Sequence, residues 1–367
     1  MTDRPFGSEY LRWAKTKPAA RFDLTSSGVP YLPLRELPVT LDDLEISGTG
    51  AYGYPPLQQA IALRYRVDEA CVAAAMGTSM ANYLALAALV QPGDEVLIEH
   101  PTYEPLIAVA RYLGAEVRHF ARRADDGFRL DPAEVERGIT PRTRAVVITN
   151  LHNPSSARAD DDTLRAIGRL AERVGARVIV DEVYLDALWE PAPRTAFHLG
   201  DRFVSTNSLT KVYGLNGLRC GWVLADPALA ERMWRLTELF NNVSVHAAER
   251  MSLAAFRDLD AIARRSRTLL DANAAALNAF YAARPELDAM PHVHGTVSFP
   301  RLRSGDAETL CGVLTNRYET AVVPGRFFGA PDHVRIGLGV DPATFAEGLD
   351  RLGRALDELS GSPSARS

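Results

Sequence analysis

Short apolar runs alternate with longer segments of helical periodicity from about Val72 to Asp226, and this alternation constrains the fold more than any other feature of the chain. The apolar runs are VAAAM, EVLIEH, EVRHF, AVVITN, ARVIVDE, FVSTNS and CGWVLAD. Segments such as SMANYLALAALV, PLIAVARYLG and TLRAIGRLAERVGA lie between them. Runs such as VVIT and VIV are apolar on both faces, which is typical of strands that helices cover on each side. The alternation therefore predicts an α/β core.

The pattern changes after Asp226 to long helical stretches. Short strands then follow near HGTVSFP, AVVPG and HVRIGLG, and an amphipathic helix, ATFAEGLDRLGRALDEL, closes the chain. A chain of 367 residues exceeds what one compact core usually holds. We expect a large domain over residues 41–240 and a smaller α+β domain that combines residues 1–40 with 241–360. Residues 361–367 are expected to form a flexible tail.

The composition argues against several classes of protein. The net charge of −5, without a dense basic run, indicates no nucleic-acid binding. Cys71, Cys220 and Cys311 are far apart, which argues against a disulfide framework and a thiolate metal site, and we expect no metal. The N-terminal residues have no apolar signal core, and no segment approaches the ~18 consecutive apolar residues of a membrane span. We expect a cytoplasmic protein without membrane contact.

Lysine is scarce in this chain, and one of its lysines lies in a distinctive segment, SLTKVYGLNGLRCGW, from Ser208 to Trp222. Lys15 and Lys17 lie near the start, Lys211 lies in this segment, and the other 41 − 3 = 38 basic residues are arginine. An amine can condense with an aldehyde, whereas a guanidinium stays protonated and cannot. The positive charge of Arg219 would favour the neutral, nucleophilic form of this amine. A surface lysine without a chemical role is the alternative.

Polar side chains follow several of the expected strands, at the edge of an α/β sheet where ligands gather. In GTSMA a glycine turn precedes a helix, and its free backbone N–H groups with the hydroxyls of Thr78 and Ser79 would hold a phosphate. A plain helix N-cap is the alternative. In HPTYEP, Tyr103 can lie flat on a planar ligand ring, although a tyrosine at the rim of the core would look the same.

Asp181 ends the strand ARVIVD, where an ionised carboxylate is costly unless it meets a cation such as a pyridinium nitrogen. Tyr184, three residues later, can reach a phenolic oxygen on the same ring. Asn153 lies in NLHNPSS, where Asn-Pro also reads as an ordinary turn. Arg335 lies in the strand HVRIGLG, where its guanidinium suits a carboxylate or a structural ion pair.

In this order, these residues resemble a class I/II aminotransferase of the aspartate aminotransferase fold, a pyridoxal-phosphate enzyme of fold type I. The most specific part is S-x-x-K-x-x-G-x-x-G-x-R-x-G-W, which is met by Ser208, Lys211, Gly214, Gly217, Arg219, Gly221 and Trp222. The resemblance implies a mainly parallel seven-stranded sheet in the large domain. It also implies transfer of an amino group between an amino acid and a 2-oxo acid by a ping-pong aldimine/ketimine mechanism.

The resemblance also implies a role for each candidate residue. Lys211 would hold pyridoxal 5′-phosphate as an internal aldimine and then move the proton between the substrate α-carbon and C4′ of the cofactor. Asp181 would keep the pyridine nitrogen protonated. Tyr103 would stack on the ring, and Asn153 and Tyr184 would bind its oxygen. The other implied cofactor contacts are Thr78, Ser79, Met80, Ser208 and Arg219, and the implied substrate contacts are Arg335, Asn153 and Gly28.

A homodimer with shared active sites is implied by AYGYPPL. Tyr52 matches the tyrosine that members of the family extend to the phosphate in the neighbouring subunit, and Tyr54 is close enough to compete. One departure is the loop Asn153-Pro154-Ser155-Ser156, which lacks the glycine of the usual Asn-Pro-Thr-Gly.

The segments TSSGVP and HGTVSFP are also similar to capreomycidine synthase-like branches. A pyridoxal-phosphate-dependent lyase, decarboxylase or cyclase on the same scaffold is therefore the alternative activity. A nicotinamide enzyme is disfavoured because no GxGxxG follows a strand.

Overall fold

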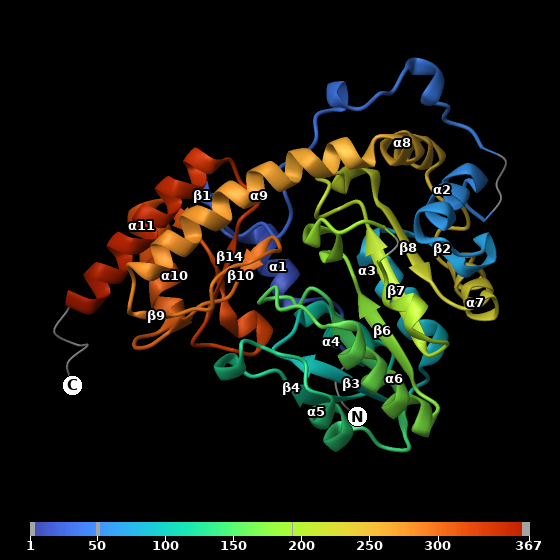
Figure 1. Ribbon diagram of the computed structural model, residues 1–367, viewed down its shortest axis with the longest axis horizontal. Coiled ribbons are helices and arrows are strands. Elements are labelled where there is room, and N and C mark those ends of the chain that lie inside the picture. Colours follow the sequence, from blue (N-terminus) through green and yellow to red (C-terminus); the bar gives the residue numbers. More distant parts are fainter. Residues whose placement is uncertain (1–3, 49–51, 193, 362–367) are drawn as a thin grey trace.

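The computed structural model of the protein describes residues 4–48, 52–192 and 194–361, and it contains a seven-stranded sheet in the order β2-β8-β7-β6-β5-β3-β4 (Figure 1). All neighbouring strands in this sheet are parallel except β8, which is antiparallel to both β2 and β7. The mainly parallel sheet of the prediction is thereby confirmed. The strands are β2 (Val72–Met76), β3 (Glu95–His100), β4 (Glu116–Ala121), β5 (Thr143–Thr149), β6 (Arg177–Asp181), β7 (Phe203–Ser208) and β8 (Cys220–Leu224).

Helices cover both faces of this sheet, as the apolar strands require. In β5, Ala145 and Val147 pack in a core cluster with residues of α3, α4 and α7, whereas Val146 and Ile148 pack in a second cluster with residues of α5 and α6. This division follows from the two-residue period of a strand. The helices are α3 (Gly77–Leu89), α4 (Glu104–Tyr112), α5 (Pro132–Gly138), α6 (Asp161–Val174) and α7 (Pro227–Thr237).

A smaller α+β part is built from both ends of the chain. The parallel pairing of β1 (Phe22–Asp23) with β12 (Thr320–Ala321) joins the N-terminal segment to the C-terminal third. The antiparallel strands β10 (Val297–Ser298), β14 (Val334–Gly337) and β13 (Val323–Pro324) form a second small sheet. The pair β9 (Leu287–Asp288) and β11 (Arg301–Leu302) adds two further strands. Helices α10 (Ala307–Tyr318) and α11 (Pro342–Gly361) pack with these strands in a core that includes Leu24.

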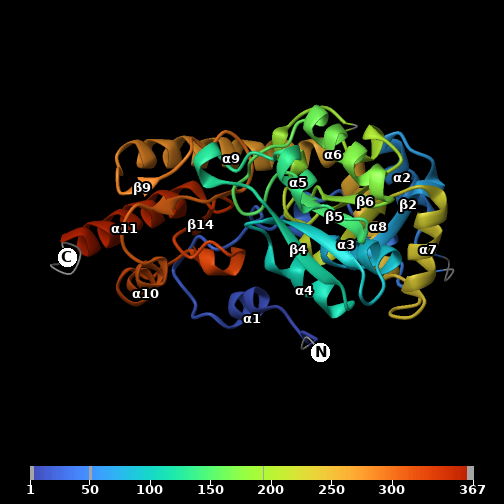
Figure 2. The same ribbon diagram turned by 90° about the horizontal axis from the view of Figure 1, so that it is seen from below.

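The long helix α9 (Leu259–Ala282) connects the two parts, as Figures 1 and 2 show. Helices α2 (Pro55–Tyr65) and α8 (His246–Arg257) pack together beside the large sheet. We propose that residues 41–240 form the large domain and that residues 1–40 with 241–360 form the small one, with α8 docked on the large domain. Of the expected tail, residues 362–367 lie outside the described residues.

The sequence patterns do not predict α1 (Glu9–Thr16), α2 or α10. Helix α1 is only eight residues long, so the helical spacing of its apolar residues Tyr10, Trp13 and Ala14 spans too short a stretch to identify a helix. Within the described residues, no helix is both long and apolar enough to cross a membrane.

Candidate active site

A cavity of about 370 Å³ opens at the carboxyl ends of the strands of the large sheet. It is lined mostly by polar side chains from separate elements of the large part, together with two residues of α1. Most of the residues that the sequence predicts as contacts of a phosphorylated aldehyde cofactor meet here. The lining residues are Leu11, Lys15, Thr78, Ser79, Asn82, Tyr103, Thr149, Asn153, Asp181, Val183, Tyr184, Ser208, Thr210, Lys211 and Arg219.

Lys211 follows β7 and extends its amine into this cavity. Its Nζ donates a hydrogen bond to Ser27 Oγ at 3.0 Å. Desolvation, the largest influence, and the charges of Arg335 and Arg219 together lower the pKa of Lys211 to about 8, whereas the charge of Asp181 opposes them. A larger fraction of this amine is therefore neutral near pH 7 than for an exposed lysine, as a nucleophile requires.

Asp181 ends β6 at the floor of the cavity and is only 4% exposed. Its Oδ2 accepts a hydrogen bond from Asn82 Nδ2 at 2.7 Å, and its Oδ1 accepts one from the backbone N–H of Val183 at 3.1 Å. Burial raises the pKa of Asp181 to about 6, and these two hydrogen bonds and the charge of Lys211 limit the rise. The carboxylate is ionised at neutral pH and can hold a proton on a nearby ring nitrogen.

The turn between β2 and α3 has the geometry of a phosphate site. Helix α3 begins at Gly77, so its first backbone N–H groups lack partners within the helix. Thr78 Oγ1 donates to Ser208 Oγ at 2.7 Å. Arg219 lies across the turn, with Nη2 donating to the carbonyl oxygen of Met76 at 3.1 Å. The hydroxyl of Thr210 is buried without a partner in the described structure. This set of donors fits a phosphate.

Two of the predicted cofactor contacts, Met80 and Tyr103, lie apart from the phosphate donors. Met80 does not line the cavity, because its side chain packs against the core of the sheet. Its backbone N–H lies four residues after the N-cap Met76, where it is bonded within α3, so a contact of Met80 with the phosphate stays a prediction. Tyr103 caps the start of α4 and lines the cavity wall, where its ring meets Tyr10 edge to face at 5.7 Å between centroids.

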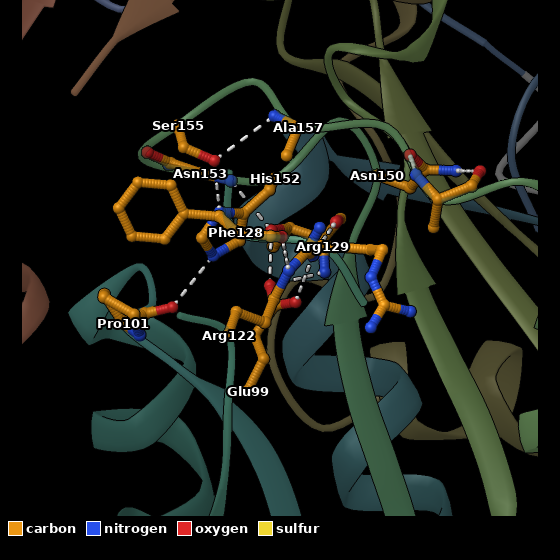
Figure 3. A network of polar contacts seen from close by, with 12 residues as sticks. Glu99, Pro101, Arg122, Phe128, Arg129, Asn150, His152, Asn153, Ser155 and Ala157 are labelled. Carbon is orange, nitrogen blue, oxygen red and sulfur yellow. Dashed lines mark hydrogen bonds and ion pairs between the residues drawn. The ribbon is translucent and has the colours of Figure 1, made fainter. Parts of the chain in front are cut away.

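A buried network fixes the loop that carries Asn153 (Figure 3). Glu99 accepts hydrogen bonds from Arg122 Nη1 at 2.8 Å and from the backbone N–H of Thr149 at 2.7 Å. Thr149 Oγ1 in turn accepts from the backbone N–H of Asn153 at 2.9 Å. Glu99 and Arg122 are almost fully buried, so their ion pair holds the loop in place through Thr149. The missing glycine of this loop is replaced by Ser156, which adopts φ +63°. Its hydroxyl donates to the carbonyl oxygen of Val297.

Arg335 in β14 lies behind the cavity with no exposed surface. Its Nη1 donates to Asn153 Oδ1 at 3.1 Å, and its Nη2 donates to Tyr10 Oη at 2.7 Å and to the carbonyl oxygen of Thr25 at 3.1 Å. Its Nε has no partner among the described residues. Gly28 passes close to Lys211, since a Cβ on this glycine would lie 3.2 Å from the backbone oxygen of Lys211.

Tyr52 lies outside the cavity of its own chain. Its side chain is 46% exposed, its hydroxyl donates to Glu238, and its ring packs against Trp234. Tyr54 precedes α2 and meets His246 edge to face. The contact of either tyrosine with a neighbouring subunit stays a prediction.

Several residues of the site are missing from the sequence prediction. Asn82 lies one helical turn after Ser79, so the spacing of α3 indicates that both face the cavity. Tyr10 and Lys15 belong to α1, which is too short for its sequence pattern to place it beside the cavity. Within the described part of the chain, no group of three or more His, Cys, Asp or Glu side chains is arranged to hold a metal ion.

The chain matches known proteins over most of its length. A profile of the family described as aminotransferase class I and II matches residues 35–352. Capreomycidine synthase of Streptomyces vinaceus is 31% identical over 92% of this chain and 90% of its own length. The arginine–pyruvate transaminase AruH of Pseudomonas aeruginosa is 30% identical over 84% of this chain and 82% of its own.

Two solved structures are similar in fold to nearly the whole chain. A PLP-dependent aminotransferase from Streptococcus suis has a TM-score of 0.90 at 25% identity, and the match covers 98% of this chain and 100% of that one. The PLP-dependent cyclase OrfR has a TM-score of 0.87 at 28% identity, with the same coverage of 98% and 100%.

Proposed function

The chain belongs to the class I and II aminotransferases, and from this membership we propose which of its residues carry the transfer of an amino group between an amino acid and a 2-oxo acid. The protein is a pyridoxal-phosphate-dependent aminotransferase of fold type I. When bound, pyridoxal phosphate supplies an aldehyde that condenses with amines and a ring that withdraws electrons from the substrate α-carbon. The roles of the individual side chains follow from their positions around the cavity.

Lys211 is the catalytic base in this proposal. Its Nζ holds the cofactor before substrate enters and afterwards accepts the proton from the substrate α-carbon. The lowered pKa of Lys211, about 8, supports this role because the amine must lose its proton to act. Ser27, which accepts a hydrogen bond from Nζ, orients the amine between the two steps.

The other side chains bind the cofactor and orient it. Asp181 holds a proton on the ring nitrogen, and Tyr184 and Asn153 bind the ring oxygen. Tyr103 packs on the face of the ring. The phosphate is held by Arg219, the hydroxyls of Thr78, Ser79, Ser208 and Thr210, and the first N–H groups of α3, which Met80 follows in the same turn.

Arg335 binds the substrate α-carboxylate, with Asn153 and the backbone of Gly28 beside it. The buried Nε without a partner supports this role, because a carboxylate would satisfy it. In this structure Tyr10 Oη accepts a hydrogen bond from one of the two N–H groups on Nη2 of Arg335. We therefore expect α1 to shift, or the hydroxyl to turn toward the carboxylate, when substrate binds.

One observation carries this assignment: the amine of Lys211 and the buried carboxylate of Asp181 line the same cavity as the phosphate-type donors of α3. The test is a Lys211→Ala variant, supplied with pyridoxal phosphate, a panel of amino acids and a panel of 2-oxo acids. We expect loss of at least ~10³-fold in the rate of keto acid formation, because a general base and a covalent anchor are removed together.

The matched control is Lys15→Ala, which removes the other amine that lines the cavity. We expect this control to retain turnover. Wild-type turnover in Lys211→Ala would overturn the assignment of the base.

We also propose that the protein is a cytoplasmic homodimer in which Tyr52 reaches the phosphate in the partner subunit. Support comes from exposed apolar side chains close to Tyr52. Ile46 lines a surface cavity with Gly53 and Tyr54, and Leu239 and Phe240 directly follow Glu238, the hydrogen-bond partner of Tyr52. Such side chains on one part of a surface are typical of an interface between subunits.

A second activity is favoured by one specific finding, the 31% identity to capreomycidine synthase over 92% of the chain. On this alternative the same site would release or cyclise its product without a 2-oxo acid acceptor. Analysis of the products of single amino acids, with and without acceptor, separates the two. Transfer that depends on the acceptor supports the aminotransferase, and a cyclic product formed without it supports the alternative.

A further inference from the structure

Three buried side chains from three elements form a continuous chain of hydrogen bonds, in which Asn82 and Asp181 line the cavity and Thr206 lies behind them. Thr206 Oγ1 in β7 donates to Asn82 Oδ1 in α3 at 2.6 Å. Asn82 Nδ2 donates to Asp181 Oδ2 at the end of β6 at 2.7 Å. Thr206 has no exposed surface, and Asn82 and Asp181 are each 4% exposed. Burial on this scale makes the two hydrogen bonds costly to lose.

The fold places these three side chains together. Asp181 and Thr206 are register partners in the parallel strands β6 and β7, so their side chains leave the sheet on the same face. Helix α3 packs on that face. Asn82 stands one turn after Ser79, and it bridges the two strand residues from above.

The direction of the two hydrogen bonds suits an ionised carboxylate. An ionised aspartate only accepts hydrogen bonds, so it must face the amide nitrogen of Asn82. The amide oxygen then accepts a hydrogen bond from the Thr206 hydroxyl, so the oxygen and the nitrogen of the amide each have a partner. A protonated Asp181 that donated toward Asn82 would need the amide reversed.

We propose that Asn82, anchored by Thr206, is a positioning residue that keeps Asp181 ionised and aims its free lone pairs at the ring nitrogen of the cofactor. The inference rests on the proposed role of Asp181. It adds a residue of α3 to the groups that set the protonation of the ring. Asn82 occupies one lone pair of Oδ2 and leaves the remaining ones to the ring N–H.

The charges around Asp181 explain why such a residue is needed. Burial is the largest influence on the pKa of Asp181 and raises it, and Glu99 on β3 raises it further. The hydrogen bond from Asn82 is the largest influence that lowers it, ahead of the backbone N–H of Val183 and the charge of Lys211. Tyr103 and Tyr184, which also face this carboxylate, have pKa values raised by burial and stay neutral.

The test compares Asn82→Leu, which keeps the approximate volume and removes the amide, with the wild-type protein. Pyridoxal phosphate labelled with ¹⁵N in the ring reports the protonation of the ring nitrogen by its chemical shift over a pH series. We expect cofactor affinity to fall about tenfold or more, since a hydrogen bond to a charged group is lost. We also expect the ¹⁵N shift at neutral pH to move toward the unprotonated value.

Two further variants make the result specific. Thr206→Val removes only the anchor of the amide, and we expect smaller changes in the same direction. Asn273→Leu is the matched control, because Asn273 is a buried asparagine that donates to the carbonyl oxygens of Leu338 and Val340, away from the cavity. We expect it to lower stability to unfolding without a change in the ¹⁵N shift.

Wild-type affinity and a wild-type ¹⁵N shift in Asn82→Leu would overturn the inference while leaving the function intact. A wild-type protein whose bound cofactor has an unprotonated ring nitrogen would instead overturn the role of Asp181. If Asn82→Leu does not fold, the ¹⁵N shift measured in Thr206→Val decides, since an unchanged value there contradicts the proposed anchoring of Asn82 by Thr206.

Discussion

Burying the amine of Lys211 has a consequence for stability in the absence of cofactor. The pKa of this amine is about 8 in the folded chain and 10.5 in its ordinary state. Between these values the unfolded chain binds more protons than the folded one, so stability rises with pH across that window. At pH 7 Lys211 is protonated in both the folded and the unfolded chain. The full cost of burying its ammonium group therefore lowers the free energy of unfolding at this pH.

We expect Lys211→Met to raise the free energy of unfolding of the cofactor-free protein at pH 7, by on the order of 1 to 3 kcal/mol. The gain should shrink as the pH rises from about 8 and vanish above 10.5, where the lysine is neutral in both states. Urea denaturation at a series of pH values measures it. Lys15→Met is the control, since Lys15 is exposed and its substitution removes no buried charge. A Lys211→Met variant that is less stable at pH 7 would contradict this account.

The turn from β2 into α3 depends on a glycine for two reasons. Gly77 adopts φ +76°, and a Cβ at this position would lie 2.3 Å from Nη2 of Arg219. Any larger residue would therefore strain the backbone and push away the guanidinium that is proposed to hold the phosphate.

We expect Gly77→Ala to weaken the binding of pyridoxal phosphate by about tenfold or more, because a charged contact to the phosphate is displaced. Gly93→Ala is the matched control: it has the same sign of φ, +90°, but nothing lies within 4 Å of its added Cβ. Both variants should lose stability to unfolding, and only Gly77→Ala should lose cofactor affinity. Equal affinities in the two variants would contradict the proposed phosphate site.

Two copies of the chain are needed to complete each active site if Tyr52 crosses between subunits. The wild-type protein should then elute at twice the 40.1 kDa mass of the chain. We expect Lys211→Ala and Tyr52→Ala each to be impaired alone, and a mixture that has exchanged subunits to recover activity. In the mixed dimer one site joins an intact Lys211 to the partner's Tyr52 and is complete.

The same exchange distinguishes the two tyrosines. Replacing Tyr52→Ala by Tyr54→Ala in the mixture tests whether the second tyrosine is the one that crosses. A mixture that regains no activity with either variant would mean that each site is built from one chain. The activity of the mixture relative to its components is the measurement.

Much of this molecule can be predicted from the sequence. Strands such as β5 and β6 are recognisable because burial on both faces demands continuous apolar runs, and each predicted strand of the sheet is present. The carboxyl ends of those strands must share one edge of the sheet, so residues such as Asp181 and Ser208 meet there. The choice of lysine at position 211 is visible because arginine is used at nearly every other basic position.

Other parts depended on the tertiary structure. The contact of Tyr10 with Arg335 joins residues 325 positions apart, and that of Asn82 with Asp181 joins residues 99 apart. Local periodicity says which face of a helix is buried, but it does not say which side chain of another element lies opposite. The residue types and their spacing were thus enough to predict the chemistry of the cavity. The hydrogen bonds that tune it were decided by packing, because only the folded chain brings donor and acceptor within reach and removes the competing water.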